Sequence, residues 1–168
     1  GATLGLATSW QSLGDGATVR NVYTGMSGHM GLLAHRLCEA GLTGETDGVR
    51  SVFGSVYADR FDADLVVRDL GREFLIERNY FKLHSAARLI HTALDVLTAI
   101  MARQPGGRID PDTVEHIDIE GYYRLTTVSQ KSVTTSFGAK FSLEFAVATL
   151  LFHGRPDLAN FEAAAVAN

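Results

Sequence analysis

The sequence predicts an α+β fold in two parts, an all-helical part over residues 1–72 and a mixed part over residues 73–168. Through most of the first part, apolar residues recur at the spacing of a helix. From residue 73 onward, stretches rich in aromatic and branched residues, or of alternating polarity, are interleaved with helical ones. The second part is therefore expected to follow the order strand, helix, strand, helix.

The first part is expected to contain three helices. Residues 2–12 form an uncharged apolar run typical of a buried helix, and residues 28–40 carry an apolar stripe at helical spacing. Gly41 is a plausible C-terminal cap for the second helix. A short third helix is expected to begin at Thr46 or Asp47, whose side chains can accept the first free amide hydrogens.

The second part begins with residues 73–83, whose aromatic and branched residues predict a strand. A helix is expected from the candidate N-cap Ser85 to about residue 103. Polar and apolar residues alternate over residues 113–125, which predicts a strand with one face in water. The last helix is expected over residues 139–154, where a glycine ends it.

Composition narrows the class of protein. The net charge of -4 gives no electrostatic basis for binding nucleic acid. No apolar run reaches the roughly 18 residues of a membrane span, and the first residues lack the features of a signal peptide, so no membrane partner is expected. The single cysteine, Cys38, has helical apolar neighbours and is expected to be a core thiol, with the reducing cytoplasm as its compartment.

Most familiar motifs of cofactor and metal sites are missing from the sequence. Neither GxGxxG nor GxxxxGK[ST] occurs, which argues against a phosphate-binding loop. His84 and His91 are two helical turns apart, and HExxH is absent, so no metal site is expected. Both ends of the chain resemble the middle of a helix, and the chain is therefore expected to be a piece of something longer.

The strongest candidate site is the stretch KLHSAARLIHTALD, in which His84, Arg88, His91 and Asp95 recur at steps of four, three and four. On one helix, these steps would place all four on the same face. Periodicity alone favours a face exposed to water. The alternative is an anion site, in which Lys82 and Arg88 hold carboxylates, His84 or His91 moves protons, and Asp95 orients a histidine.

Three stretches of the sequence, taken in order, favour the anion site over the exposed face. RNVYTGMSGHMGLLAHRLCEAGLTG begins with Arg20, and AKFSLEFAVATLLFHG lies near the end of the chain. Between them, Lys82 and His91 keep the spacing of a KPYPxCRxxH motif, with Arg88 at its arginine. Together they resemble the MmgE/PrpD family, which includes 2-methylcitrate dehydratase, cis-aconitate decarboxylase and iminodisuccinate epimerase.

This resemblance implies a lyase that acts on small polycarboxylates without a metal or flavin, so no cofactor is expected. Family members join a helical domain to an α+β lid like chorismate mutase, and they are usually homodimers. Residues 1–72 would then be part of the helical domain, and residues 73–168 an incomplete lid. By position, the resemblance places Lys82, Arg88 and His91 in the active-site motif of the lid and Arg20 at a basic substrate-binding position. We therefore expect Lys82, His91 and the nearby His84 to be catalytic, and Arg20 and Arg88 to bind the substrate.

Departures from the family pattern leave other functions open. Tyr23, His84, Ala87 and Glu144 replace residues that are usual in the family. An isomerase or decarboxylase with another substrate is therefore one alternative. Family chains are more than twice as long, and their N-terminal half supplies a catalytic Asp and His. A second alternative is thus a non-catalytic binding or assembly module, and the partner is expected to be the missing half or a second copy.

Overall fold

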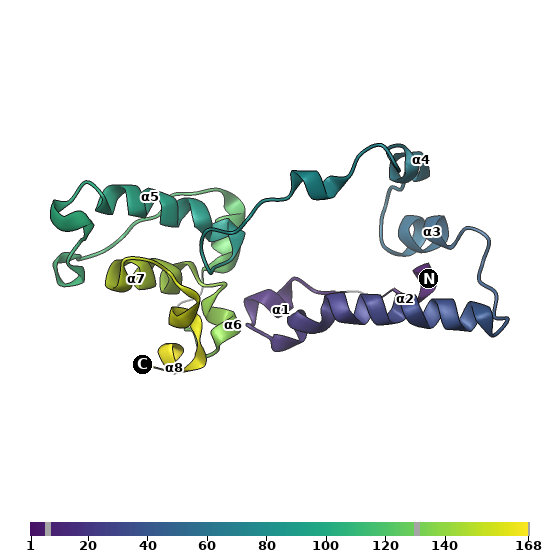
Figure 1. The fold of residues 1–168 in the computed structure, drawn as a ribbon, viewed down its shortest axis with the longest axis horizontal. Helices are drawn as coiled ribbons and strands as arrows, with labels where there is room; N and C mark the ends of the chain where they lie inside the picture. Colours follow the sequence, from purple (N-terminus) through teal and green to yellow (C-terminus); the bar gives the residue numbers. More distant parts are fainter. Residues whose placement is uncertain (6–7, 130–131, 168) are drawn as a thin grey trace. The chain divides into compact units, whose positions relative to one another are not determined.

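The computed structural model describes residues 1–5, 8–129 and 132–167. The chain divides into two compact units (Figure 1). The first unit contains residues 1–8 and 21–80, and the second contains residues 9–20 and 81–168. The boundary that the sequence predicts, between residues 72 and 73, falls inside the first unit.

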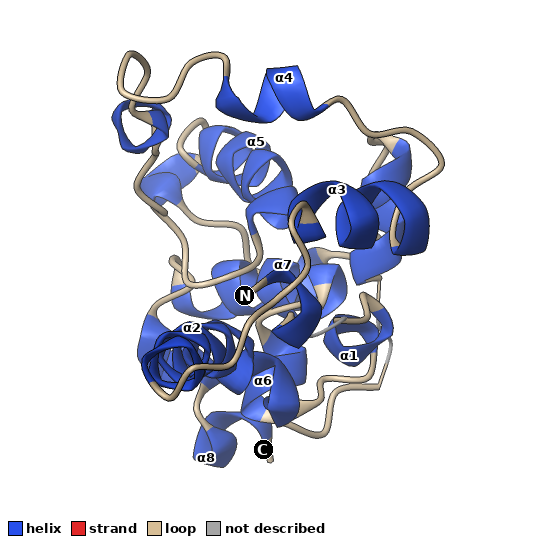
Figure 2. Ribbon diagram, turned by 90° about the vertical axis from the view of Figure 1, so that its right-hand side faces the viewer, coloured by secondary structure: helices blue, strands red, loops and turns tan. Residues whose placement is uncertain are grey.

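Helices and short helical turns make up the regular structure (Figure 2). The α-helices of the described residues are α1 (Gln11–Gly14), α2 (Tyr23–Glu39), α3 (Gly48–Ser51), α4 (Ala63–Val67), α5 (His91–Met101), α6 (Ser136–Ala139), α7 (Leu143–His153) and α8 (Ala163–Val166). A π-helical turn spans Val52–Val56. The 3-10 turns are Ala2–Leu4, Thr18–Val22, Leu75–Arg78, Arg88–Ile90, Pro105–Gly107, Pro111–Thr113, Tyr123–Val128 and Leu158–Phe161. None of the helices described is long and apolar enough to cross a bilayer.

The first unit is built on α2, which has 17 residues, none of them buried. The 3-10 turn Ala2–Leu4 contacts both α2 and α3. Among the described apolar residues of this unit, only Val52 is buried. Gly41, with a φ of 87°, follows α2 in the left-handed conformation that the sequence predicts for its end. Asp47 caps α3 by accepting the amide hydrogen of Arg50, as expected.

The second unit has a continuous core between α5 and α7, which pack against each other. Its fully buried members include Ile90 and Leu94 from the α5 side and Leu150 from α7. The side chain of Ser142 caps α7 by accepting the amide hydrogen of Phe145. Gly154 ends this helix at a φ of 80°, which confirms the predicted end.

The prediction of strands is wrong for the residues that the structure describes, which form none (Figure 2). Within 73–83, Leu75–Arg78 forms a 3-10 turn. Within 113–125, the backbone is extended at Val114 and again at Tyr122, but no neighbouring segment of the described chain pairs with it. A strand is stable only when its amide and carbonyl groups bond to a second strand, and alternation of polarity alone does not supply one.

Two helix predictions and one prediction of burial also need correction. The apolar run 2–12 is not one helix, because its described residues form a 3-10 turn at its start and the beginning of α1 near its end. Ser85 does not cap α5, which is preceded by extended backbone at Ala87 and the turn Arg88–Ile90. Cys38 is exposed on α2 instead of lying in a core.

Candidate functional site

His84 and Asp95 come together although His84 lies outside the helix. The residues between His84 and α5 are held by backbone hydrogen bonds, from Ser85 to the carbonyl of Pro156 (3.5 Å) and from Ala87 to that of Lys140 (2.7 Å). These bonds fix the path of the loop that leads into α5. As a result, Nε2 of His84 lies 2.7 Å from Oδ1 of Asp95, one turn into α5.

His91, the first residue of α5, completes a group of three side chains, His84, His91 and Asp95, which we call the histidine cluster. The rings of His84 and His91 meet edge to face, with centroids 5.1 Å apart and planes at 83°. Nε2 of His91 donates a hydrogen bond to the carbonyl oxygen of Ala86, at 3.2 Å. The sequence spacing predicts a stripe of four side chains on one helix. The structure brings His84, His91 and Asp95 together by folding a loop against the helix.

The hydrogen-bond partners determine where each neutral imidazole carries its proton. A carboxylate and a carbonyl oxygen can only accept hydrogen bonds, so the nitrogen that faces each of them must be the protonated one. That nitrogen is Nε2 in both His84 and His91. In their neutral forms, both rings therefore keep Nδ1 as the atom that can accept a proton.

Burial lowers the pKa of His91 below its usual 6.5, and the nearby charges of His84 and Lys82 lower it further. The hydrogen bond to Ala86 and the carboxylate of Asp95 act in the opposite direction without reversing the shift. His91 is therefore neutral near pH 7, which is the form that a general base needs.

The cationic residues that the sequence predicts have different positions. Lys82 is exposed two residues before His84, and its positive charge is one of the causes that lower the pKa of His91. Arg88 is exposed in the turn before α5, and Arg20 is half-buried in the turn Thr18–Val22. Neither arginine takes part in the hydrogen bonds or the ring contact that build the cluster. Among the described residues, no group of three or more His, Cys, Asp and Glu side chains could hold a metal ion.

A family model matches the half of the chain that carries this cluster. It is the model of the MmgE/PrpD C-terminal domain, and it matches residues 84–168. The chain belongs to the MmgE/PrpD family. The matched region begins at His84 and contains the whole histidine cluster, whereas Arg20 and Lys82 lie before it. Searches of the curated proteins and of the solved structures give no match.

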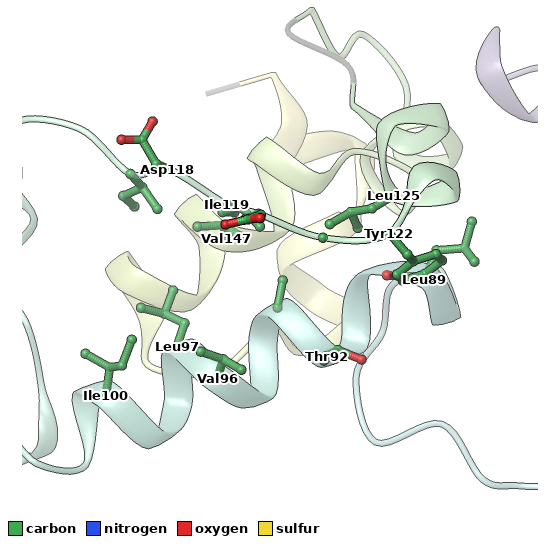
Figure 3. A pocket seen from close by; sticks show the side chains of 14 residues that line it. Leu89, Thr92, Val96, Leu97, Ile100, Asp118, Ile119, Tyr122, Leu125 and Val147 are labelled. Carbon is green, nitrogen blue, oxygen red and sulfur yellow. Dashed lines mark hydrogen bonds between the residues drawn. The ribbon is translucent and has the colours of Figure 1, made fainter.

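A second feature of this MmgE/PrpD domain is an apolar groove of about 220 Å³ between α5 and the extended segment that leads to Tyr122. Figure 3 shows Leu97 and Ile100 directed from α5 toward the side where Ile119 lies. None of the predicted site residues lines this groove. Its lining comes from a different face of α5 from that of His91 and Asp95, so the groove and the cluster are separate features.

Asp95 is the functional candidate that sequence reasoning underestimates. Its position four residues after His91 indicates a shared helix face, but it does not show whether any group meets the carboxylate. The decisive partner, His84, comes from a loop held by Pro156 and Lys140, and this tertiary contact leaves no signal in local spacing.

Proposed function

We propose that this chain is the part of an MmgE/PrpD lyase that binds a small polycarboxylate and moves protons during its dehydration, as in 2-methylcitrate dehydratase. The observation that carries the proposal is the histidine cluster, in which His84 follows Lys82 by two residues. It combines two imidazoles with defined protonation sites and a cation, which are the groups that this chemistry requires.

In the proposed reaction, Nδ1 of neutral His91 removes the proton on the carbon next to a substrate carboxylate. Lys82, Arg88 and Arg20 hold the carboxylates, and their positive charge stabilises the electron density that develops there. The carbon–oxygen bond on the neighbouring carbon then breaks, and a double bond forms. His84 in its protonated form gives a proton to the departing hydroxide, so that water leaves.

Substitution of His91 tests this proposal. His91→Asn is expected to lower turnover of 2-methylcitrate by about 10²–10⁴-fold, because it removes the base. The matched control is His116→Asn, which removes an imidazole of the same unit whose side chain is 71% exposed. Turnover is followed by the ultraviolet absorbance of the conjugated product, and binding of citrate is measured by calorimetry.

The possible outcomes separate the alternatives. Measurable turnover that is equal in His91→Asn and the wild type would contradict the role of His91. Binding of citrate that depends on Lys82 but without turnover would favour a binding module. Turnover of cis-aconitate or an epimerisable acid, with no dehydration of 2-methylcitrate, would favour the decarboxylase or isomerase alternative.

A further inference from the structure

Two histidine–carboxylate pairs in the second unit differ in how they are built. His116 and Asp118 are two residues apart in sequence, 3.4 Å apart in space, and largely exposed. His84 and Asp95 are eleven residues apart in sequence and 2.7 Å apart in space, and the His84 side chain keeps only 13% of its surface exposed. The contact between His84 and Asp95 therefore forms only in the folded chain, whereas closeness in sequence is enough to bring His116 and Asp118 together.

The ring of His84 is constrained from two sides. Asp95 accepts the Nε2 hydrogen, and His91 packs edge to face against the ring. The Asp95 side chain is 61% exposed, but a hydrogen bond to a charged acceptor is stronger than one between neutral groups. Together, these contacts restrict rotation of the imidazole as well as the choice of its protonated nitrogen.

We propose that Asp95 is a positioning residue, which holds His84 with its proton on Nε2 so that Nδ1 is the atom that exchanges a proton with the hydroxyl group of a bound polycarboxylate. The role of Nδ1 toward the substrate rests on the proposed function, whereas the effect of Asp95 on His84 does not. Asp95 itself does not touch the substrate in this scheme.

A merely structural ion pair makes a different prediction. If Asp95 only stabilised the fold, removing its charge would lower stability without changing which nitrogen of His84 carries the proton. If Asp95 positions His84, the neutral variant lets the imidazole exchange between its two neutral forms, because an amide can either accept from or donate to Nε2.

The test compares Asp95→Asn with the matched control Asp118→Asn by long-range ¹H–¹⁵N NMR of the imidazole rings, with His84 assigned from His84→Gln. Wild-type neutral His84 is expected to show a single form with the proton on Nε2. Asp95→Asn is expected to show an averaged signal of both forms, and Asp118→Asn the wild-type signal. In turnover of 2-methylcitrate, Asp95→Asn is expected to lower kcat about tenfold or more with little change in KM.

Each result decides a separate point. A wild-type His84 with its proton on Nδ1 overturns the proposal without any variant, and so does an unchanged His84 signal in a folded Asp95→Asn. If the signal changes as expected but neither wild type nor variant binds or converts a polycarboxylate, the proposed function fails while the positioning of His84 by Asp95 stands.

Discussion

The two units of the chain differ most in what they bury. The second unit closes a core in which Ile90, Leu94 and Phe161 lose all their exposed surface. In the first unit, α2 runs for 17 residues without burying any of them. The histidine cluster lies in the unit with the core, and its distances depend on helices that the core fixes. Helical periodicity therefore predicts where a helix forms, whereas a neighbouring element decides whether its apolar face becomes a core.

Removing core volume should have the largest effect. Leu94→Ala, at a position with 0% exposure in α5, is expected to lower the free energy of unfolding by about 3 kcal/mol, from lost burial and the cavity left behind. Leu32→Ala, at a 65% exposed position in α2, is expected to change it by less than about 0.5 kcal/mol. Denaturant unfolding measures both. An equal loss of unfolding free energy in both variants would show that the α2 face is buried, which would contradict the difference between the two units.

A smaller effect should appear in the pH dependence of stability, through His91. Its pKa in the folded chain lies below the usual 6.5, so the unfolded chain binds more protons between those two values. The stability that neutral His91 contributes is therefore complete above pH 6.5 and declines as the pH falls through that value toward the folded pKa. His91→Asn should remove this part of the slope in unfolding experiments at several pH values. An identical slope in the variant would contradict the lowered pKa.

The smallest effect is expected at Cys38, which lies on the exposed surface of α2. Cys38→Ser should change the free energy of unfolding by less than about 0.5 kcal/mol. The thiol of the native chain should also react with a thiol reagent without denaturant. Protection of Cys38 in the native chain would instead support the core position that its sequence neighbours predict.

The sequence predicts the ends of helices better than their packing. Asp47, Gly41 and Gly154 act as predicted, because capping depends on the conformation of a few adjacent residues. The strand predicted over 113–125 fails, because a strand needs a partner from elsewhere in the chain. The core position predicted for Cys38 is wrong for a similar reason, because apolar residues at helical spacing do not show whether another part of the chain covers that face.

The sequence points to the two histidines of the candidate site but not to the contacts that join them to Asp95, and the catalytic roles of His84, His91 and Lys82 remain predictions. The family spacing selects His91, and His84 lies within the same motif. The pairing of His84 with Asp95 could not be predicted, since it depends on the backbone bond from Ala87 to Lys140, which holds the loop in place. Arg20 and Arg88 remain predictions as substrate-binding residues.

The most direct test of the central claim, that the histidine cluster is an anion-binding and proton-transfer site, is an NMR titration of His91 with and without saturating citrate. A carboxylate bound beside His91 favours its charged form, so citrate is expected to raise the pKa of His91. In Lys82→Ala, the pKa of His91 should start higher, because a nearby positive charge is gone, and citrate should raise it less. A pKa of His91 that citrate leaves unchanged in the wild type would contradict the claim.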